Sequence, residues 1–244
     1  MDTQSGAGSE ATKETIASLA SHAIGCQRGA DARYLIGITG PPGAGKSTLM
    51  QALVAAVSRQ IGREAVAGVP MDGFHMTNAR LASLGRTQRK GAPDTFEASE
   101  FVDALLRLRS VTDKATLWPT YSRNLHEPVK EGMTIHPAAR LIFVEGNYLL
   151  FDDPPWKQVG ALLDEVWYVD ADRPTLRQRL LNRQLRGGRP LAAAAAHVDH
   201  SDSVNIDTVE QTRGPADRVV RVDSGDPLLR ELTDPATGAP LVLD

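Results

Sequence analysis

The sequence predicts an α/β fold of three layers, in which helices cover both faces of a parallel β-sheet. Two observations lead to this prediction. Short apolar runs rich in β-branched residues alternate along the chain with segments of helical periodicity. A glycine-rich stretch, GITGPPGAGKST, joins the first such run to the first long helical segment. The 244 residues provide enough chain for one or two domains with a sizeable core.

The chain is expected to begin with a tail and a single helix. Residues 1–11 are polar and are expected to be disordered. Residues 12–33 are expected to form an N-terminal helix packed on the core, with Gly25 placed to end it. Four residues in this segment share one apolar face at helical spacing: Ile16, Leu19, Ala20 and Ala23. The main domain is expected over 34–230, followed by a C-terminal segment, 231–244.

Five apolar runs predict the strands of the sheet, because strands buried on both faces are almost continuously apolar. They span residues 34–39, 65–71, 140–146, 165–170 and 217–223. Helical periodicity appears between them, after the glycine-rich stretch, around Phe101 to Leu108 and over Pro174 to Arg186. Strands that alternate with helices in this way predict a parallel sheet. Its ligands are expected beyond the carboxyl ends of the strands.

Composition narrows the class of partner. The formal net charge is −3, which argues against a nucleic acid held through its phosphates. Cys26 is the only cysteine, so no internal disulfide can form and a cytoplasmic location is expected. The polar N-terminus has no basic start followed by an apolar core, and no apolar run is long enough to cross a bilayer. No membrane partner is expected.

The glycine-rich stretch matches the phosphate-binding loop, Gly40-x-x-x-x-Gly45-Lys46-Ser47. Glycines allow backbone N–H groups to converge on an anion at a helix N-terminus. Lys46 is expected to reach the β- and γ-phosphates of ATP, and the Ser47 hydroxyl to bind Mg²⁺. A glycine-rich turn with an exposed lysine is the alternative. The expected nucleotide-binding residues are Gly40, Pro41, Pro42, Gly43, Ala44, Gly45, Lys46, Ser47 and Thr48.

Two carboxylates follow predicted strands. Asp72, in MDGFH, comes after the second strand and is a candidate general base for an attacking hydroxyl. Its alternative role is to cap the next turn together with Gly73. Glu145 ends the apolar run LIFVE and is a candidate for the Mg²⁺ site, the alternative being an ordinary surface carboxylate.

Two turn-rich stretches are candidates for a small-molecule pocket. They span residues 89–97 and 118–128 and combine aromatic and polar side chains: Phe96, Trp118, Tyr121 and Arg123. Ordinary loop packing is the alternative for both stretches.

Arginines are concentrated between Arg173 and Arg189, where no acidic residue occurs. Arg179, Arg183 and Arg186 follow one another at i, i+4 and i+7, so they share one helical face. A helical lid over about 177–198 that closes on phosphates is the expected function. Solvated surface and an RNA-binding stripe are the alternatives. The segment HVDH, 197–200, is expected to be a polar helix end, with a zinc site as the alternative.

Taken in order, the motifs resemble those of the P-loop kinases that include uridine kinase, phosphoribulokinase and bacterial pantothenate kinase. The similarity is greatest to a nucleoside/nucleotide-kinase-like group that includes fructose-transport-system kinases. It runs from about Tyr34 to Val222 and rests on MDGFHM, KGAPDTF, PTYSR, VEGNYLL and VNIDTVEQTRGPADRVV, besides the phosphate-binding loop. The resemblance implies a P-loop NTPase three-layer sandwich with a small helical lid.

The resemblance also implies an ATP- and Mg²⁺-dependent phosphotransferase. Asp72 would be the general base, with Lys46, Arg179 and Arg183 as further catalytic residues and the stretch around Ser224 and Gly225 near the adenine. The implied metal residues are Ser47 and Glu145. The implied substrate-binding residues are Asp72, His75, Lys90, Phe96, Tyr121, Arg123, Glu145 and Asn147.

The expected acceptor is a small metabolite with a hydroxyl group: a nucleoside, a sugar or a pantothenate-like alcohol. The acceptor segments match none of the known patterns cleanly, so the substrate stays open. A monomer or a homodimer is expected. The alternative function is an ATP-binding regulatory module that transfers no phosphoryl group. A guanine-reading switch is disfavoured, because the sequence contains no Asn-Lys-x-Asp stretch.

Overall fold

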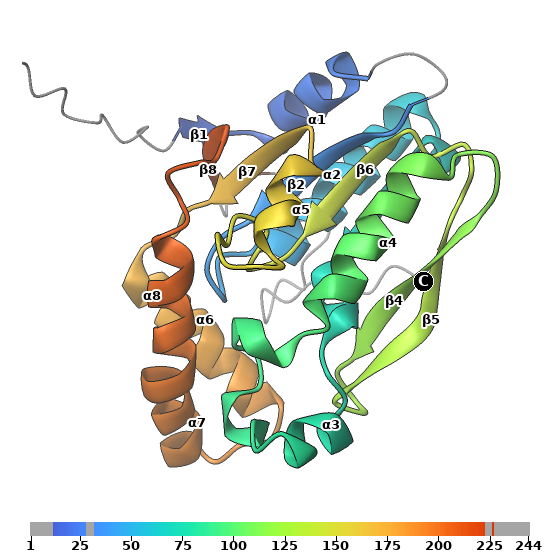
Figure 1. The fold of residues 1–244 in the computed structure, drawn as a ribbon. Coiled ribbons are helices and arrows are strands. Elements are labelled where there is room, and N and C mark those ends of the chain that lie inside the picture. Colours follow the sequence, from blue (N-terminus) through green and yellow to red (C-terminus); the bar gives the residue numbers. More distant parts are fainter. Residues whose placement is uncertain (1–11, 28–31, 223–225, 227–244) are drawn as a thin grey trace, which may run out of the picture.

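A computed structural model describes residues 12–27, 32–222 and 226 of the chain. Within these residues, a six-stranded sheet has the order β1-β8-β7-β2-β6-β3, and every neighbouring pair is parallel. Helices lie on both sides of this sheet (Figure 1). The prediction of a three-layer α/β fold is therefore confirmed.

The five predicted strands are all present, with small differences at their ends. They are β2 (Tyr34–Thr39), β3 (Val66–Pro70), β6 (Leu141–Glu145), β7 (Glu165–Val169) and β8 (Arg218–Val222). All residues of β2 are buried, and β2 lies between β6 and β7 in the sheet. Because the sheet is parallel, the ends of β2, β3 and β6 meet at one edge, where Pro70 pairs with Glu145 and Glu145 with Ile38.

One face of the sheet is covered by α1 (Ile16–Gly25), α2 (Lys46–Ile61) and α6 (Arg173–Arg186). The four apolar residues predicted for the N-terminal helix are fully buried there, and α1 ends at Gly25. Alternate strand residues such as Ile36 and Phe143 complete this core. Asp226 accepts a hydrogen bond from Ile16 N (3.0 Å) and so satisfies a backbone donor at the start of α1.

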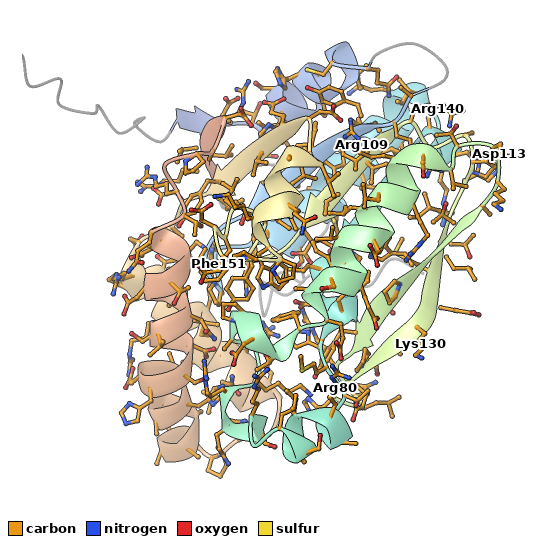
Figure 2. All side chains as sticks on the ribbon, in the orientation of Figure 1. Arg80, Arg109, Asp113, Lys130, Arg140 and Phe151 are labelled. Carbon is orange, nitrogen blue, oxygen red and sulfur yellow. The ribbon has the colours of Figure 1, made fainter. Side chains whose placement is uncertain are left out.

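The opposite face is covered by α4 (Ala98–Ser110), α5 (Lys157–Ala161) and a β-hairpin. Phe101 and Trp118 are fully buried in this core, and their rings pack edge to face. Arg109, labelled in Figure 2, binds Asp164 just before β7 through two hydrogen bonds of 2.9 and 3.1 Å. This contact connects α4 to the N-terminal end of β7, whereas the phosphate-binding loop lies at the opposite, carboxyl ends of the strands.

The hairpin corrects one prediction. Residues 118–128 were expected to be turn-rich, but β4 (Thr116–Ser122) and β5 (Glu127–Ile135) form an antiparallel pair around the turn that joins them. Its register shifts between Trp118 and Thr120, around Pro119, which has no N–H group to donate. Residues 89–97 are irregular as expected, with short 3₁₀ turns at Thr87–Arg89 and Pro93–Thr95.

The start of the described chain also differs from the expectation. Part of the segment expected to be helical is a short strand, β1 (Thr12–Glu14), which pairs with β8. The expected tail and C-terminal segment, and the stretch around Ser224 and Gly225, lie outside the described residues. The limits of the main domain remain predictions.

A helical arm completes the molecule. It contains α6, α7 (Leu191–His197), one π-helical turn (Val198–Asp202) and α8 (Ser203–Glu210), drawn in orange to red in Figure 1. The short α3 (Asn78–Ser83) follows the Asp72 turn (Met71–Phe74). None of the helices within residues 12–222 has both the length and the hydropathy that a membrane crossing requires.

Candidate active site

The phosphate-binding loop joins β2 to α2, which begins at Lys46. Gly40, Gly43 and Gly45 have φ angles of 142°, 83° and 101°, a region that side chains disfavour. A Cβ atom on Gly40 would lie 2.5 Å from the carbonyl oxygen of Val169, so the loop needs glycine here for space as well. The loop therefore adopts the backbone conformation that lets N–H groups gather at a helix N-terminus.

Lys46 folds back over this loop. Its Nζ donates hydrogen bonds to the carbonyl oxygens of Gly40 (2.8 Å) and Pro41 (2.9 Å), and the residue is only 7% exposed. Burial lowers the pKa of Lys46, while the nearby carboxylates of Glu145 and Asp72 favour the charged form. The ammonium group is thus held by neutral oxygens, next to negative charge, at the place where phosphates would bind.

Glu145 ends β6 beside the loop and accepts a hydrogen bond from Ser47 Oγ at 3.2 Å. The carboxylate is buried, which excludes the alternative of an ordinary surface residue. Burial raises the pKa of Glu145, and the negative charge of Asp72 raises it further. A hydroxyl and a carboxylate are hard oxygen ligands, so the chemistry of Ser47 and Glu145 fits Mg²⁺.

Asp72 lies in a 3₁₀ turn, Met71–Phe74, directly after β3. Its side chain is 39% exposed, and it acts electrostatically on Lys46, Glu145 and Arg123. Its carboxylate also lies 4.0 Å from His75 Nδ1. An accessible carboxylate beside the loop can accept a proton from a bound hydroxyl.

His75 is held just behind Asp72. Its Nδ1 lies 2.8 Å from the Asp72 carbonyl oxygen, which can only accept, so Nδ1 carries a hydrogen. Burial lowers the pKa of His75 and favours the neutral ring. The ring packs against Phe96 and Tyr121, with centroid distances of 4.0 and 4.8 Å. These three predicted substrate-binding residues therefore form one aromatic wall.

Lys90 lies over this wall, with Nζ 5.3 Å from the centre of the Tyr121 ring. Its ammonium group donates to Asn78 Oδ1 (2.6 Å) and to the His126 carbonyl oxygen (2.8 Å). Both acceptors are neutral oxygens, and no carboxylate pairs with Lys90 among the residues described. Arg123 is likewise without an ion pair within that part of the chain, and it acts electrostatically on Asp72 and Arg183.

Arg179 and Arg183 approach from α6. Arg179 donates to the carbonyl oxygens of Gly43 (3.2 Å) and Ala44 (3.1 Å), so this helix lies directly against the phosphate-binding loop. Arg183 is exposed, and its charge acts on Lys46, His75 and Arg123. Arg173 and Arg177 instead pair with acidic side chains of α8 and of the π-helical turn. The arginine cluster therefore divides into two groups, only one of which faces the loop.

The structure does not bring every expected residue to this site. Trp118 is buried in the core, where its Nε1 donates to the Pro70 carbonyl oxygen (2.9 Å), so it forms no pocket wall. Asn147, in contrast, stays near the loop, because its backbone carbonyl accepts from the hydroxyl of Thr39, the residue before Gly40 (3.2 Å), and its substrate-binding role stays a prediction. The segment HVDH is helical as expected, and it forms no metal-ligating group of three within the described residues.

Gly73 is a residue of this site that sequence analysis did not identify as important. A Cβ atom there would lie 2.1 Å from the Pro119 carbonyl oxygen, so a side chain would collide with β4. The glycine lets the Asp72 turn and the hairpin touch. The only sign of this role in the sequence is the position of Gly73 within MDGFH. The residue that it contacts, Pro119, is 46 residues further along the chain.

The chain is similar in sequence to known proteins. Residues 35–214 match the family described as "Phosphoribulokinase / Uridine kinase family". The protein YggC of Escherichia coli is 33% identical over 190 residues, covering 78% of each chain. An "ATP-dependent kinase-like protein notR'" of Aspergillus versicolor is 33% identical over 159 residues, covering 62% of this chain and 92% of that one.

A crystal structure from Silicibacter sp. TM1040 has a similar fold. It is titled a "putative fructose transport system kinase", is 33% identical in sequence and superposes with a TM-score of 0.78. The match covers 84% of this chain and 98% of the other. The similarity thus extends over most of both chains.

Proposed function

The chain belongs to the phosphoribulokinase/uridine kinase family and is an ATP-dependent small-molecule kinase, and we propose that it transfers the γ-phosphoryl group of ATP to a hydroxyl of a small metabolite. One observation carries this proposal. Lys46, Glu145 and Asp72 follow three adjacent strands and interact electrostatically at one edge of the sheet. A candidate phosphate cradle, a candidate metal ligand and a candidate base thus lie side by side, which supports the proposal.

The first step is binding of the triphosphate. Backbone N–H groups of the loop and the N-terminus of α2 would hold the phosphate oxygens, where the helix dipole favours negative charge. Lys46 would exchange its bonds to loop carbonyls for bonds to the β- and γ-phosphates. Because phosphate oxygens are anionic, this exchange restores the full charge of Lys46 and offsets the cost of its burial.

Ser47 and Glu145 would hold Mg²⁺. When bound, this ion neutralises charge on the transferring phosphoryl group. Glu145 must be ionised to act as a ligand, so its raised pKa couples metal binding to proton release.

Asp72 would orient the acceptor hydroxyl and accept its proton as the new bond to phosphorus forms. The hydrogen bond from His75 to its backbone carbonyl fixes this turn. Arg183 would stabilise the charge on the phosphoryl oxygens, and Arg179 would keep α6 seated on the loop. Movement of the arm over the phosphates would exclude water and so suppress ATP hydrolysis.

The acceptor would lie against the wall of His75, Phe96 and Tyr121. A nucleoside, a sugar and a pantothenate-like alcohol all remain candidates. Lys90 and Arg123 have no ion-pair partner in the described residues, whereas Arg80, Arg86 and Arg89 nearby are each paired with a carboxylate. Two such cations favour an acceptor that carries a carboxylate or a phosphate besides its hydroxyl.

The experiment is an ADP-release assay with ATP, Mg²⁺ and a panel of acceptors. The panel pairs neutral nucleosides and sugars with phosphorylated sugars and hydroxy acids. Release that depends on one acceptor class supports the kinase. Slow release that no acceptor changes would instead support the alternative, a regulatory module that binds ATP without transfer to a small molecule.

A further inference from the structure

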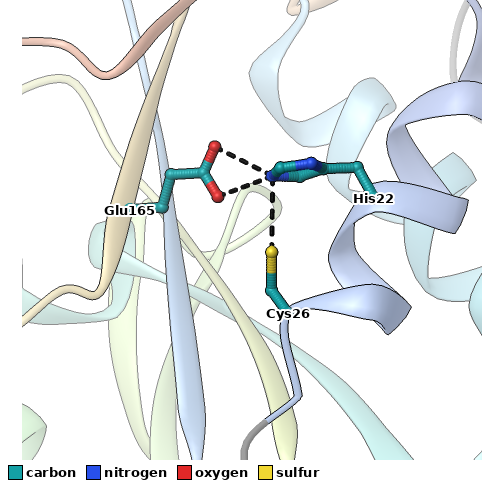
Figure 3. A group of neighbouring side chains, drawn as sticks. All are labelled: His22, Cys26 and Glu165. Carbon is teal, nitrogen blue, oxygen red and sulfur yellow. Dashed lines mark hydrogen bonds and ion pairs between the residues drawn. The ribbon is translucent and has the colours of Figure 1, made fainter.

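A second cluster of chemically active side chains lies away from the proposed active site. His22 and Cys26 are one turn apart at the C-terminal end of α1, and Glu165 is the first residue of β7. Figure 3 shows all three side chains pointing into the same space between helix and strand. Val169, at the other end of β7, is the residue that contacts the phosphate-binding loop. The cluster is therefore separated from the nucleotide site by the length of this strand.

The three potential ligand atoms are already close together. Nε2 of His22 lies 2.8 and 3.1 Å from the two carboxylate oxygens of Glu165 and 3.5 Å from Cys26 Sγ. All three atoms lie within 4.8 Å of one another. In a tetrahedral zinc site, bond lengths of about 2.1 Å to N and O and about 2.3 Å to S place neighbouring ligand atoms about 3.4 to 3.6 Å apart. The nitrogen and sulfur have this spacing, while the nearer carboxylate oxygen is about half an ångström too close to the nitrogen and lies within 4.8 Å of the sulfur.

Neighbouring groups orient the carboxylate. Trp167 Nε1 donates to Glu165 Oε1 at 2.7 Å, which leaves Oε2 as the oxygen nearer to His22. Partners of this kind fix ligand orientation in metal sites. Glu165 is also shielded from solvent, with only 12% of its side chain exposed, whereas His22 is 34% exposed. An ion could therefore enter from the helix side and meet a carboxylate that is already oriented.

The charges around the cluster also balance. Arg218 is the cation packed against it, with Nη2 3.4 Å from His22 Nδ1 and Nε 3.7 Å from Glu165 Oε1. Its charge is offset by Glu14, whose Oε1 lies 2.6 Å from Arg218 Nη1. A divalent ion would then be neutralised by the Glu165 carboxylate and the Cys26 thiolate. Coordination by Nε2 leaves the His22 proton on Nδ1, so Nη2 of Arg218 would have to turn away from that nitrogen.

We propose that His22, Cys26 and Glu165 bind a Zn²⁺ ion that fastens α1 to β7, with water in the fourth coordination position. A set of imidazole, thiolate and carboxylate ligands suits Zn²⁺ rather than Mg²⁺ or Ca²⁺, which take oxygen ligands. Binding releases the thiol proton of Cys26 to solvent, and the hydrogen that His22 Nε2 shares with Glu165 moves to Nδ1, so the imidazole stays neutral. The role is structural, because the ion would join a helix on one face to the strand that begins beside it.

The test is a titration of the metal-free, full-length protein with Co²⁺, followed by competition with Zn²⁺. Cys26 is the only cysteine of the chain, so a thiolate-to-cobalt charge-transfer band can report on this site alone. We expect the band to saturate at one equivalent and to disappear when Zn²⁺ is added. Zn²⁺ at a hundredfold excess over its dissociation constant should raise the unfolding temperature by about 5 to 10 °C.

Two variants and a matched control complete the test. Cys26→Ser should abolish the band, and His22→Gln should weaken Zn²⁺ binding at least about tenfold. His136→Gln is the control, because His136 also faces a carboxylate, Glu64, at 3.7 Å, but has no cysteine nearby. The His136→Gln variant should bind Zn²⁺ with the affinity of the wild type. Absence of the band in folded wild-type protein would overturn the proposal, as would Zn²⁺ binding that neither Cys26→Ser nor His22→Gln weakens.

Discussion

Asp72 is the single residue on which the proposed chemistry depends most. Its carboxylate interacts electrostatically with Lys46 and Glu145 and is partly open to solvent. Asp72→Asn keeps the size of the side chain but removes its basicity. We expect kcat to fall by about 10² to 10⁴, the usual contribution of a general base, while the affinity for ATP stays nearly unchanged.

Steady-state kinetics and nucleotide titration on the same preparation test this prediction. Asp103→Asn is the matched control, because Asp103 is exposed on α4 away from the site. The control should keep wild-type kcat. Unchanged turnover in Asp72→Asn would remove this residue from the mechanism.

Glu145 gives a prediction about pH. Burial, aided by Asp72, raises the pKa of this carboxyl above its ordinary value of 4.5. Below that raised pKa the group is protonated and is a poor metal ligand, so affinity for the Mg²⁺–nucleotide complex should be lost as the pH falls. The affinity should therefore decrease between about pH 8 and about pH 5.5.

Calorimetric titration of Mg–ADP over this pH range measures the effect. Glu145→Gln should bind Mg–ADP about 10- to 100-fold more weakly at high pH and should lack the step on acidification. If the variant showed the same pH dependence as the wild type, the titrating group would have to be another residue.

Among the elements, α6 carries arginines of two kinds, those paired with a carboxylate and those directed toward the nucleotide site. Arg183 has no ion pair within the described chain and acts on the nucleotide site, whereas Arg177 pairs with Asp199 at 2.8 Å on the solvent side. We expect Arg183→Gln to lower kcat by about 10² to 10³, as the loss of one oriented charge donor does. Arg177→Gln should stay near wild-type activity, because exposed ion pairs contribute little. Equal losses in both variants would show a general effect on the arm rather than a role for Arg183.

The contact between the Asp72 turn and the hairpin gives a second prediction at this scale. Gly73→Ala would force a Cβ atom against the Pro119 carbonyl oxygen and push β4 away from the turn. We expect KM for the acceptor to rise and kcat to fall, while nucleotide binding is kept, because the phosphate-binding loop is not touched. Gly214→Ala, where nothing lies within 4 Å, is the control and should behave as the wild type. Normal acceptor kinetics in Gly73→Ala would mean that the hairpin does not shape the acceptor site.

The elements also show where sequence analysis succeeds and where it fails. The central strands β2 and β6 are buried along their whole length, so they appear in the sequence as apolar runs. The hairpin strands are mostly half-buried or exposed, contain Pro119 and Pro128, and lack a clear alternation. The three-residue β1 forms only through pairing with β8, from which it is separated by more than two hundred residues.

The same reasoning applies to the candidate site. The order of the chain in a parallel sheet brings Lys46, Asp72 and Glu145 to one edge, so their proximity could be predicted from strand ends alone. The closeness of Gly73 to Pro119 depends on how the hairpin packs, which no local pattern encodes. The cluster of His22, Cys26 and Glu165 could not be predicted from a local pattern either, because Glu165 lies 143 residues after His22 in the chain.

At the scale of the whole molecule, two apolar cores hold the sheet between its helical layers, and the proposed chemistry lies where the layers leave the strand ends uncovered. The rigid strands fix the positions of the loop, Glu145 and Asp72, while the arm carries the arginines that would close over them. This division suits phosphoryl transfer, in which positioning and charge neutralisation do most of the work. The expectation of a monomer or a homodimer stays a prediction.

The most direct test is a calorimetric titration of the folded protein with a non-hydrolysable ATP analogue in the presence of Mg²⁺. We predict binding of one nucleotide per chain, and binding at least about tenfold weaker in Lys46→Ala, since a buried charge that contacts phosphate is lost. A wild-type protein that binds no purine triphosphate under these conditions would contradict the account.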